Sequence, residues 1–147
     1  MSGQKPQDLE RTDIDKNDEI GSANRYILED ETYAIIGAAM EVYYKLGNGF
    51  AEPVYQEALG IEFEFRNILF EPQKRLHIEY KGRSLEKGYI ADFMCFGEII
   101  VEIKAITSLS PSDWSQIMNY LKASGLRVGL LFNFGSHGKM EMKRIVI

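Results

Sequence analysis

Hydrophobic residues in the first half of the chain recur at the spacing of an amphipathic helix, in two consecutive stretches. The first begins at Thr32 and places six apolar side chains on one helical face: Ile35, Ile36, Ala39, Met40, Tyr43 and Leu46. Gly47-Asn48-Gly49 would end this helix, because glycine and asparagine tolerate the left-handed C-cap conformation. The second stretch runs from about Glu52 to Asn67, has Pro53 in its first turn, and carries apolar surface at Val54, Ala58, Leu59, Ile61, Phe63 and Phe65.

The rest of the chain has the shorter alternating or continuous apolar runs that are typical of β-strands. We expect five strands, over residues 70–80, 85–95, 99–106, 127–134 and 140–147. Between the third and fourth, Ser110 and Pro111 are a helix N-cap and first position, and Gly125 would end that helix. The predicted order is ααβββαββ. It indicates an α/β (α+β) protein with a mixed sheet flanked by helices.

Residues 1–31 differ from the rest in composition. They are polar, poor in aromatic side chains and hold four basic and nine acidic residues, a net charge of −5. We interpret them as a disordered acidic leader, with a short helix possible near residues 25–31, and assign residues 32–147 to one folded domain. That domain holds 13 basic and 13 acidic side chains. Its neutrality argues against strong nonspecific affinity for nucleic acid but does not exclude such a substrate.

Several classes of protein are excluded or disfavoured by residues that are missing from the sequence. There is no apolar run long enough to cross a membrane and no apolar signal segment. The single cysteine, Cys95, permits no internal disulfide and fits a reducing, cytoplasmic location. With only two histidines, His77 and His137, a Cys/His zinc cluster cannot be built, and no phosphate-binding P-loop motif is present.

Two carboxylates and a lysine can be placed on one face of a predicted β-hairpin. If Phe96-Gly97-Glu98 forms a three-residue loop, Asp92 lies opposite Glu102 on the next strand, with Cβ atoms about 5 Å apart. Lys104 follows Glu102 by two residues and shares its face. Two close carboxylates repel one another unless a cation bridges them, so the arrangement indicates metal-dependent phosphodiester hydrolysis. A two-residue loop without a bulge would put the carboxylates on opposite faces.

Five motifs in this order resemble the GxxExxY protein family, which is assigned to the PD-(D/E)XK nuclease superfamily. They are Gly49-x-x-Glu52-x-x-Tyr55, Asp92, Glu102-Ile103-Lys104, Gln116-x-x-x-Tyr120, and the strand end at residues 130–135. The resemblance covers residues 33–147 and implies a restriction-endonuclease-like fold. Two departures stand out: many family members have histidine where this chain has Tyr43, and Ala91 replaces the proline in the superfamily's name.

The resemblance also implies roles for individual residues. Asp92 and Glu102, with the carbonyl of Ile103, would bind Mg²⁺, for which Mn²⁺ could substitute. Lys104 would orient the attacking water or stabilise charge on the phosphate. Glu52 would reach the metal from its helix, and Gln116 and Tyr120 would border the site.

Each of these residues also has a purely structural interpretation. Lys104 could form a cross-strand salt bridge, Glu52 could interact with the helix dipole, and Tyr120 could simply pack. Trp114 could stack on a base, although packing is its more common role. We interpret Cys95 as a small buried hydrophobe and both histidines as surface residues.

The leading functional hypothesis is a Mg²⁺-dependent nuclease acting on nucleic acid. Of the two kinds of nucleic acid, we expect DNA rather than RNA to be the substrate. A noncatalytic nucleic-acid-binding or adaptor domain on the same fold is the alternative, and an α/β domain with coincidental charges is the third. Since no recognition module is visible, a homo-oligomer or a protein partner could supply specificity.

Overall fold

The structure, a computed structural model, describes residues 27–147 and confirms the predicted order of elements. In chain order they are α3 (Glu29–Leu46), α4 (Glu52–Phe65), β1 (Phe70–Tyr80), β2 (Arg83–Cys95), β3 (Ile99–Lys104), α5 (Pro111–Ser124), β4 (Val128–Asn133) and β5 (Glu141–Val146). The second hairpin strand begins two residues earlier than predicted, and the third strand ends two residues earlier.

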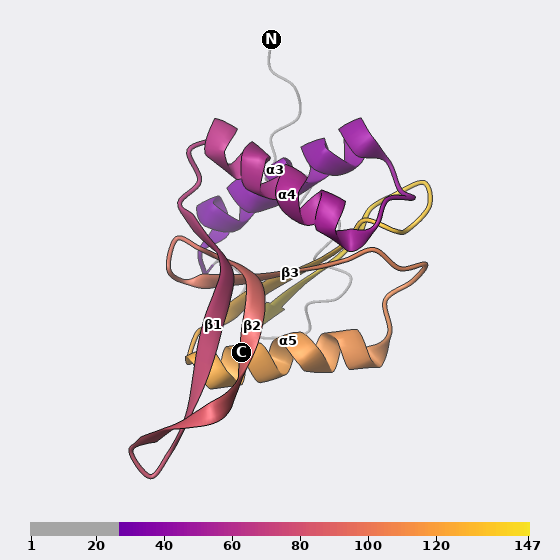
Figure 1. Cartoon of the computed structure of the whole chain (residues 1–147). Helices are drawn as coiled ribbons and strands as arrows, with labels where there is room; N and C mark the ends of the chain where they lie inside the picture. The colour runs from indigo at the N-terminus through magenta and orange to yellow at the C-terminus, as the bar shows by residue number, and fades with distance from the viewer. Residues whose placement is uncertain (1–26) are drawn as a thin grey trace.

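The five strands form one mixed sheet in the order β1-β2-β3-β4-β5. Only β3 and β4 are parallel, because α5 connects them as a crossover; the other neighbours are antiparallel. Helices α3 and α4 cover one face of the sheet and α5 covers the other (Figure 1). Both faces of β4 are therefore buried, which explains its continuous apolar sequence.

Helix α3 begins inside the segment that we predicted to be a leader. Its first turn consists of Glu29, Asp30 and Glu31, three acidic side chains that the positive N-terminal end of a helix stabilises. Composition assigned these residues to the acidic leader, although the sequence also allowed a short helix near residues 25–31, and the structure has residues 29–31 as the first turn of α3 itself. The remainder of the leader, residues 1–26, lies outside the described residues.

Helix α4 buries a narrower stripe than its apolar composition suggests. Tyr55, Leu59 and Phe63, spaced one turn apart, are fully buried against the sheet. Val54, Ile61 and Phe65, which the sequence also offered as apolar surface, are 40%, 44% and 77% exposed.

The start of α5 has the geometry that its sequence predicts. Ser110 is the N-cap, and Asp113 closes a capping box by accepting a hydrogen bond from the Ser110 backbone N–H at 2.8 Å. The helix ends at Gly125, whose φ of 74° is the left-handed conformation that glycine adopts without strain. This capping fixes the end of α5 that lies next to Lys104.

Near Asp92, strand β2 twists so that its buried side chains pass from one helical layer to the other. Phe93 packs in the core under α3 and α4, whereas Ala91, two residues before it, packs in the core under α5. Simple alternation would place both on one face. On β1, Gln73 lies beside this point with a positive φ of 50°. The β1–β2 ribbon therefore twists sharply at Asp92.

Within residues 27–147, no helix combines the length and the apolar character needed to cross a membrane.

Candidate active site

The three-residue hairpin loop is confirmed. Strands β2 and β3 pair Cys95 with Ile99 and Phe93 with Val101, which leaves residues 96–98 as the connection. Continuing this register by one residue brings Asp92 opposite Glu102. The regular ladder ends before that point, so the two strands separate where the carboxylates lie.

The two carboxylates take the place of main-chain partners in the gap between the strands. Glu102 Oε1 accepts a hydrogen bond from the Asp92 backbone N–H, and Asp92 Oδ2 accepts one from the Ile103 N–H, each at 2.8 Å. Hydrogen bonds of this kind fix the side chains rigidly. They leave the second oxygen of each carboxylate free of any bond to these two amides.

Burial and mutual repulsion shift the ionisation of this pair. Glu102 is only 4% exposed, and its burial, followed by the nearby charge of Asp92, raises its pKa to about 9. Burial also raises the pKa of Asp92, while the hydrogen bonds it accepts from Ile103 and from the Glu102 side chain work in the opposite direction. Because both pKa values are raised, we expect the pair to share a proton at neutral pH.

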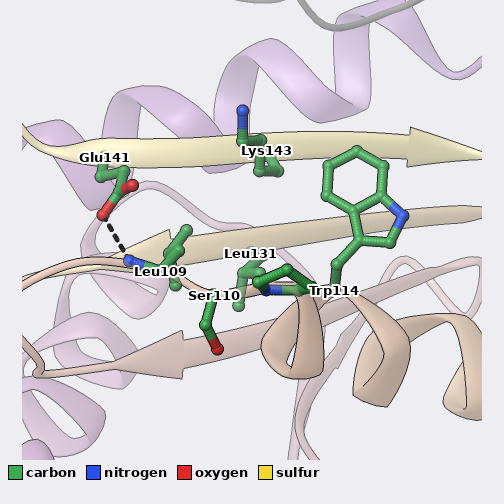
Figure 2. A pocket seen from close by; sticks show the side chains of 7 residues that line it. Leu109, Ser110, Trp114, Leu131, Glu141 and Lys143 are labelled. Carbon is green, nitrogen blue, oxygen red and sulfur yellow. Dashed lines mark hydrogen bonds between the residues drawn. The ribbon is translucent and has the colours of Figure 1, made fainter.

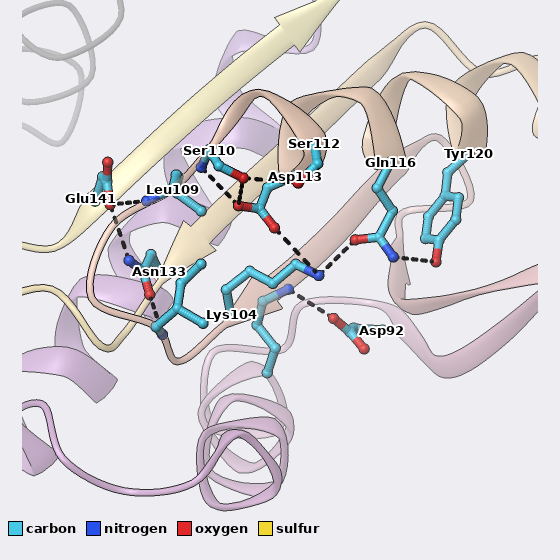
Figure 3. A network of polar contacts seen from close by, with 12 residues as sticks. Asp92, Lys104, Leu109, Ser110, Ser112, Asp113, Gln116, Tyr120, Asn133 and Glu141 are labelled. Atoms are coloured by element: carbon cyan, nitrogen blue, oxygen red, sulfur yellow. Dashed lines mark hydrogen bonds and ion pairs between the residues drawn. The ribbon is translucent and has the colours of Figure 1, made fainter.

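Lys104 lies on the α5 side of the sheet, within a chain of polar contacts (Figure 3). Its Nζ donates a hydrogen bond to Gln116 Oε1 at 2.6 Å and lies 3.9 Å from an Asp113 carboxylate oxygen. Gln116 in turn donates from Nε2 to the Tyr120 hydroxyl at 3.2 Å. The structure therefore joins the predicted residues Lys104, Gln116 and Tyr120. Asp113, which the sequence suggested only as a cap, is the additional member.

Tyr120 belongs to the electrostatic environment of the carboxylates. Burial, followed by the charges of Glu102 and Asp92, raises its pKa to about 12. The hydroxyl therefore stays protonated near neutral pH, and its role here is to accept the Gln116 hydrogen bond.

Glu52 approaches from the other layer, as the first residue of α4. Partial burial raises its pKa; the Asp92 charge acts in the same direction and the Lys104 charge opposes it. One turn later, Gln56 donates from Nε2 to the Asp92 backbone carbonyl at 3.1 Å. Sequence reasoning missed Gln56, although its i, i+4 spacing from Glu52 places both on one helix face.

The end of β4 supports the segment that follows Lys104. Asn133 is fully buried and is the parallel-strand partner of Lys104. Its Oδ1 accepts hydrogen bonds from the backbone N–H groups of Ile106 and Gly135, and its Nδ2 donates to Glu141, each at 3.0 Å. Asn133 lies in the strand-end motif at residues 130–135, but nothing in the sequence pattern predicted that its side chain would join three segments of backbone and side chain.

An open pocket of about 410 Å³ lies beside this constellation and includes neither Asp92 nor Glu102 (Figure 2). Its lining includes Trp114, Leu131 and Lys143. The Lys143 ammonium lies 5.9 Å from the Trp114 ring, and the partly buried ring packs against the core under α5. The structure therefore shows the packing contact of Trp114, on a ring that also lines the open pocket.

Other residues considered from the sequence lie away from the carboxylates. Tyr43 donates its hydroxyl hydrogen to the Ser136 carbonyl at 2.7 Å, and the buried Tyr55 ring stacks on Phe134. Cys95 is buried in the core, as predicted, and burial raises its pKa to about 12. Both histidines are exposed, also as predicted.

The donor set at the hairpin suits a hard divalent cation. Two carboxylates that must share a proton when close together would both be neutralised by Mg²⁺, which prefers oxygen ligands. Within the part of the chain that the structure describes, no three His, Cys, Asp or Glu side chains gather closely enough to hold an ion. The role of Glu52 as a further metal ligand stays a prediction.

Comparisons with known proteins give one informative result. The family model described as the PD-(D/E)XK nuclease superfamily matches residues 29–145, which extend from the start of α3 into β5 and lack only Val146 of that strand. No curated protein matches the chain. The crystal structure of SSO0001 aligns over 97% of this chain and 74% of its own, at 17% identity and a TM-score of 0.41, too slight a likeness to support an argument. The matched family model and the observed order of elements agree with the predicted restriction-endonuclease-like fold.

Proposed function

Because the chain belongs to the PD-(D/E)XK nuclease superfamily, we propose that it is a metal-dependent nuclease that hydrolyses phosphodiester bonds in nucleic acid, with DNA as its substrate. The observation that carries the proposal is the pair of opposed carboxylates, the buried Glu102 and the partly buried Asp92, with Lys104 on the same strand as Glu102. We further assign the chain to the GxxExxY group, because Glu52 of that motif lies within electrostatic reach of Asp92.

In this proposal Asp92, Glu102 and the backbone carbonyl of Ile103 hold Mg²⁺, and Mn²⁺ can replace it. A bound divalent cation polarises a phosphoryl oxygen and lowers the pKa of its water. The hydrogen bonds from the Asp92 and Ile103 amides fix one oxygen of each carboxylate and thereby orient the other. Uptake of the cation would release the proton that the two carboxylates share.

Lys104 supplies positive charge to the reacting phosphate. Its ammonium is already oriented by Gln116 and balanced at longer range by Asp113, so little reorganisation is needed when charge develops. Glu52 lies at the α4 edge of the site with a raised pKa, and we assign it the task of orienting the attacking water.

Cleavage of labelled DNA and RNA, single-stranded and duplex, with Mg²⁺, Mn²⁺ or EDTA tests the proposal. We expect cleavage of DNA that requires the cation and is lost in Asp92→Asn. Asparagine keeps an oxygen that can accept the Ile103 N–H, so this variant should remain folded. Binding without cleavage by the wild type would instead support a noncatalytic nucleic-acid-binding domain. Equal cleavage by the variant would identify a contaminant.

Gln116 and Tyr120 are expected to differ in importance. Gln116→Ala removes the acceptor that orients Lys104 and should lower kcat about 10-fold with little change in KM. Tyr120→Phe removes only the acceptor for Gln116 Nε2 and should lower kcat less than about 3-fold. Steady-state kinetics on one DNA substrate compares them. A Tyr120→Phe loss as large as that of Gln116→Ala would assign chemistry to the phenol.

A further inference from the structure

The outer part of the β1–β2 hairpin extends beyond the body of the molecule as a two-stranded arm (Figure 1). All residues from 79 to 88 are exposed, so neither helical layer covers this segment. Such a long exposed hairpin buries little apolar surface of its own and contributes little to the core. Its sequence therefore reflects some other requirement than folding.

The arm is basic, although the domain is not. The exposed segment, residues 79–88, holds three Lys or Arg side chains and two Glu, and with the base of the arm included residues 74–87 hold five and two, a net charge of +3, while residues 32–147 together are neutral. Among the described residues, no ion pair involves Arg83 or Lys87. Lys74, at the base of the arm, pairs with Glu71 at 3.4 Å, so the charge available to an anionic partner is that of the outer part, which includes Arg83 and Lys87.

One face of the arm is continuous with the candidate active site. Tyr89 lies with its ring centroid 5.0 Å from that of Tyr120, which is linked through Gln116 to Lys104. Lys87 and Arg83 follow Tyr89 outward along β2, across a bulge in which residues 85–87 lie opposite Ile78 alone. Tyr89 pairs with Leu76 and Arg83 with Tyr80, four residues further along β1, so this part of the arm extends about 13 Å, the axial length of about four base pairs of duplex.

We propose that the β1–β2 arm binds the phosphate backbone of the nucleic acid that flanks the scissile bond, with Lys87 and Arg83 as the phosphate contacts. The inference rests on the proposed function for the place of the scissile bond. The substrate is then a polymer that extends about four nucleotides or more beyond the site. A short oligonucleotide or a small diester could not reach the arm.

Binding without cleavage provides the first test. Binding of a labelled DNA of about 30 nucleotides, single-stranded and duplex, is measured in EDTA across about 50–200 mM salt. Arg83→Ala/Lys87→Ala should weaken binding and reduce the slope of log K against log salt by about 1.4 for the single strand and 1.8 for the duplex. Lys45→Ala/Lys122→Ala, which removes two exposed charges elsewhere, should leave the slope unchanged, and Arg83→Lys/Lys87→Arg should retain it.

Equal slopes for the arm variant and the wild type would overturn the proposal, as would a wild type without salt-dependent binding. Cleavage gives the second test. The arm variant should raise KM for the long DNA with kcat unchanged, and should hydrolyse bis(p-nitrophenyl) phosphate like the wild type. Arm-dependent binding without any cleavage would refute the nuclease and support the arm. Cleavage with the same KM for the arm variant and the wild type would support the nuclease and refute the role of the arm.

Discussion

Glu102→Gln is expected to stabilise the metal-free protein above about pH 5 and to abolish its stabilisation by Mg²⁺. The folded chain raises the Glu102 pKa from 4.5 to about 9, so folding takes up a proton between these pH values. The contribution of this group is therefore complete below about pH 4.5 and is lost as the pH rises toward 9. Glutamine avoids this loss because it is neutral at every pH.

The substitution is also conservative in its hydrogen bonds. A glutamine oxygen can accept the Asp92 N–H, as Glu102 Oε1 does, and its amide can donate to the Asp92 carboxylate as the protonated Glu102 does. The variant then differs from the wild type only because glutamine, unlike Glu102, does not titrate. We expect the gap in unfolding free energy to widen by about 1 kcal/mol per pH unit between pH 5 and 9.

Urea unfolding in EDTA at a series of pH values measures this gap, and thermal unfolding over a range of Mg²⁺ concentrations measures the metal response. The wild type should gain stability with Mg²⁺, whereas Glu102→Gln should not. Glu98→Gln removes an exposed carboxylate from the same hairpin and serves as the control. Parallel pH curves for Glu102→Gln and the wild type would show that Glu102 is ionised in the folded protein.

The order of elements could be predicted because each has a local cause in the sequence. The capping box at Ser110, the glycine at 125 and the glycine-centred loop at Gly97 act within a few residues, and the structure has all three. The limits of the arm could not be predicted as well. Its exposed strands lack a buried face, so the alternation that reveals a strand is missing there.

In the candidate site, too, some contacts could be predicted from local sequence and others depend on tertiary structure. Asp92, Glu102 and Lys104 could be related because one short loop fixes their register. Gln56 and Asn133 could not, since their contacts join residues 36 and 27 positions apart and depend on how α4 and β4 meet the hairpin. The twist at Asp92 is also tertiary in origin. A strand pattern in the sequence predicts continuous main-chain hydrogen bonds, so it does not reveal that the two carboxylates take their place here.

This combination of a rigid frame and separated strands explains how two carboxylates can lie together in a buried setting. Like charges opposed on a sheet are destabilising, and here backbone amides and a shared proton offset that cost. In the absence of a cation the shared proton limits the repulsion, and a divalent cation would neutralise both carboxylates. Lys104 is anchored separately, through α5, so it can be replaced without removing a hydrogen bond of either carboxylate, although its charge lowers the pKa of both.

Lys104→Met is therefore expected to lower kcat about 10²–10³-fold while leaving the Mg²⁺-dependent rise in thermal stability intact. The factor is typical for loss of one group that stabilises transition-state charge. Methionine has a similar length and removes the ammonium, and the hydrogen bond to Gln116 and the longer contact with Asp113 are lost with it. Both partners lie near solvent or have other hydrogen bonds, so the fold should persist.

Single-turnover cleavage of saturating DNA measures the chemical step, and thermal unfolding with and without Mg²⁺ measures the metal site. Asp113→Asn is the matched control, because it keeps a side chain that can cap α5 and leaves Lys104 its hydrogen bond to Gln116. It should cost less than about 10-fold in rate. Cleavage by Lys104→Met within a few-fold of the wild type would give Lys104 a structural role. Loss of the Mg²⁺ response in this variant would contradict the separation of lysine and metal.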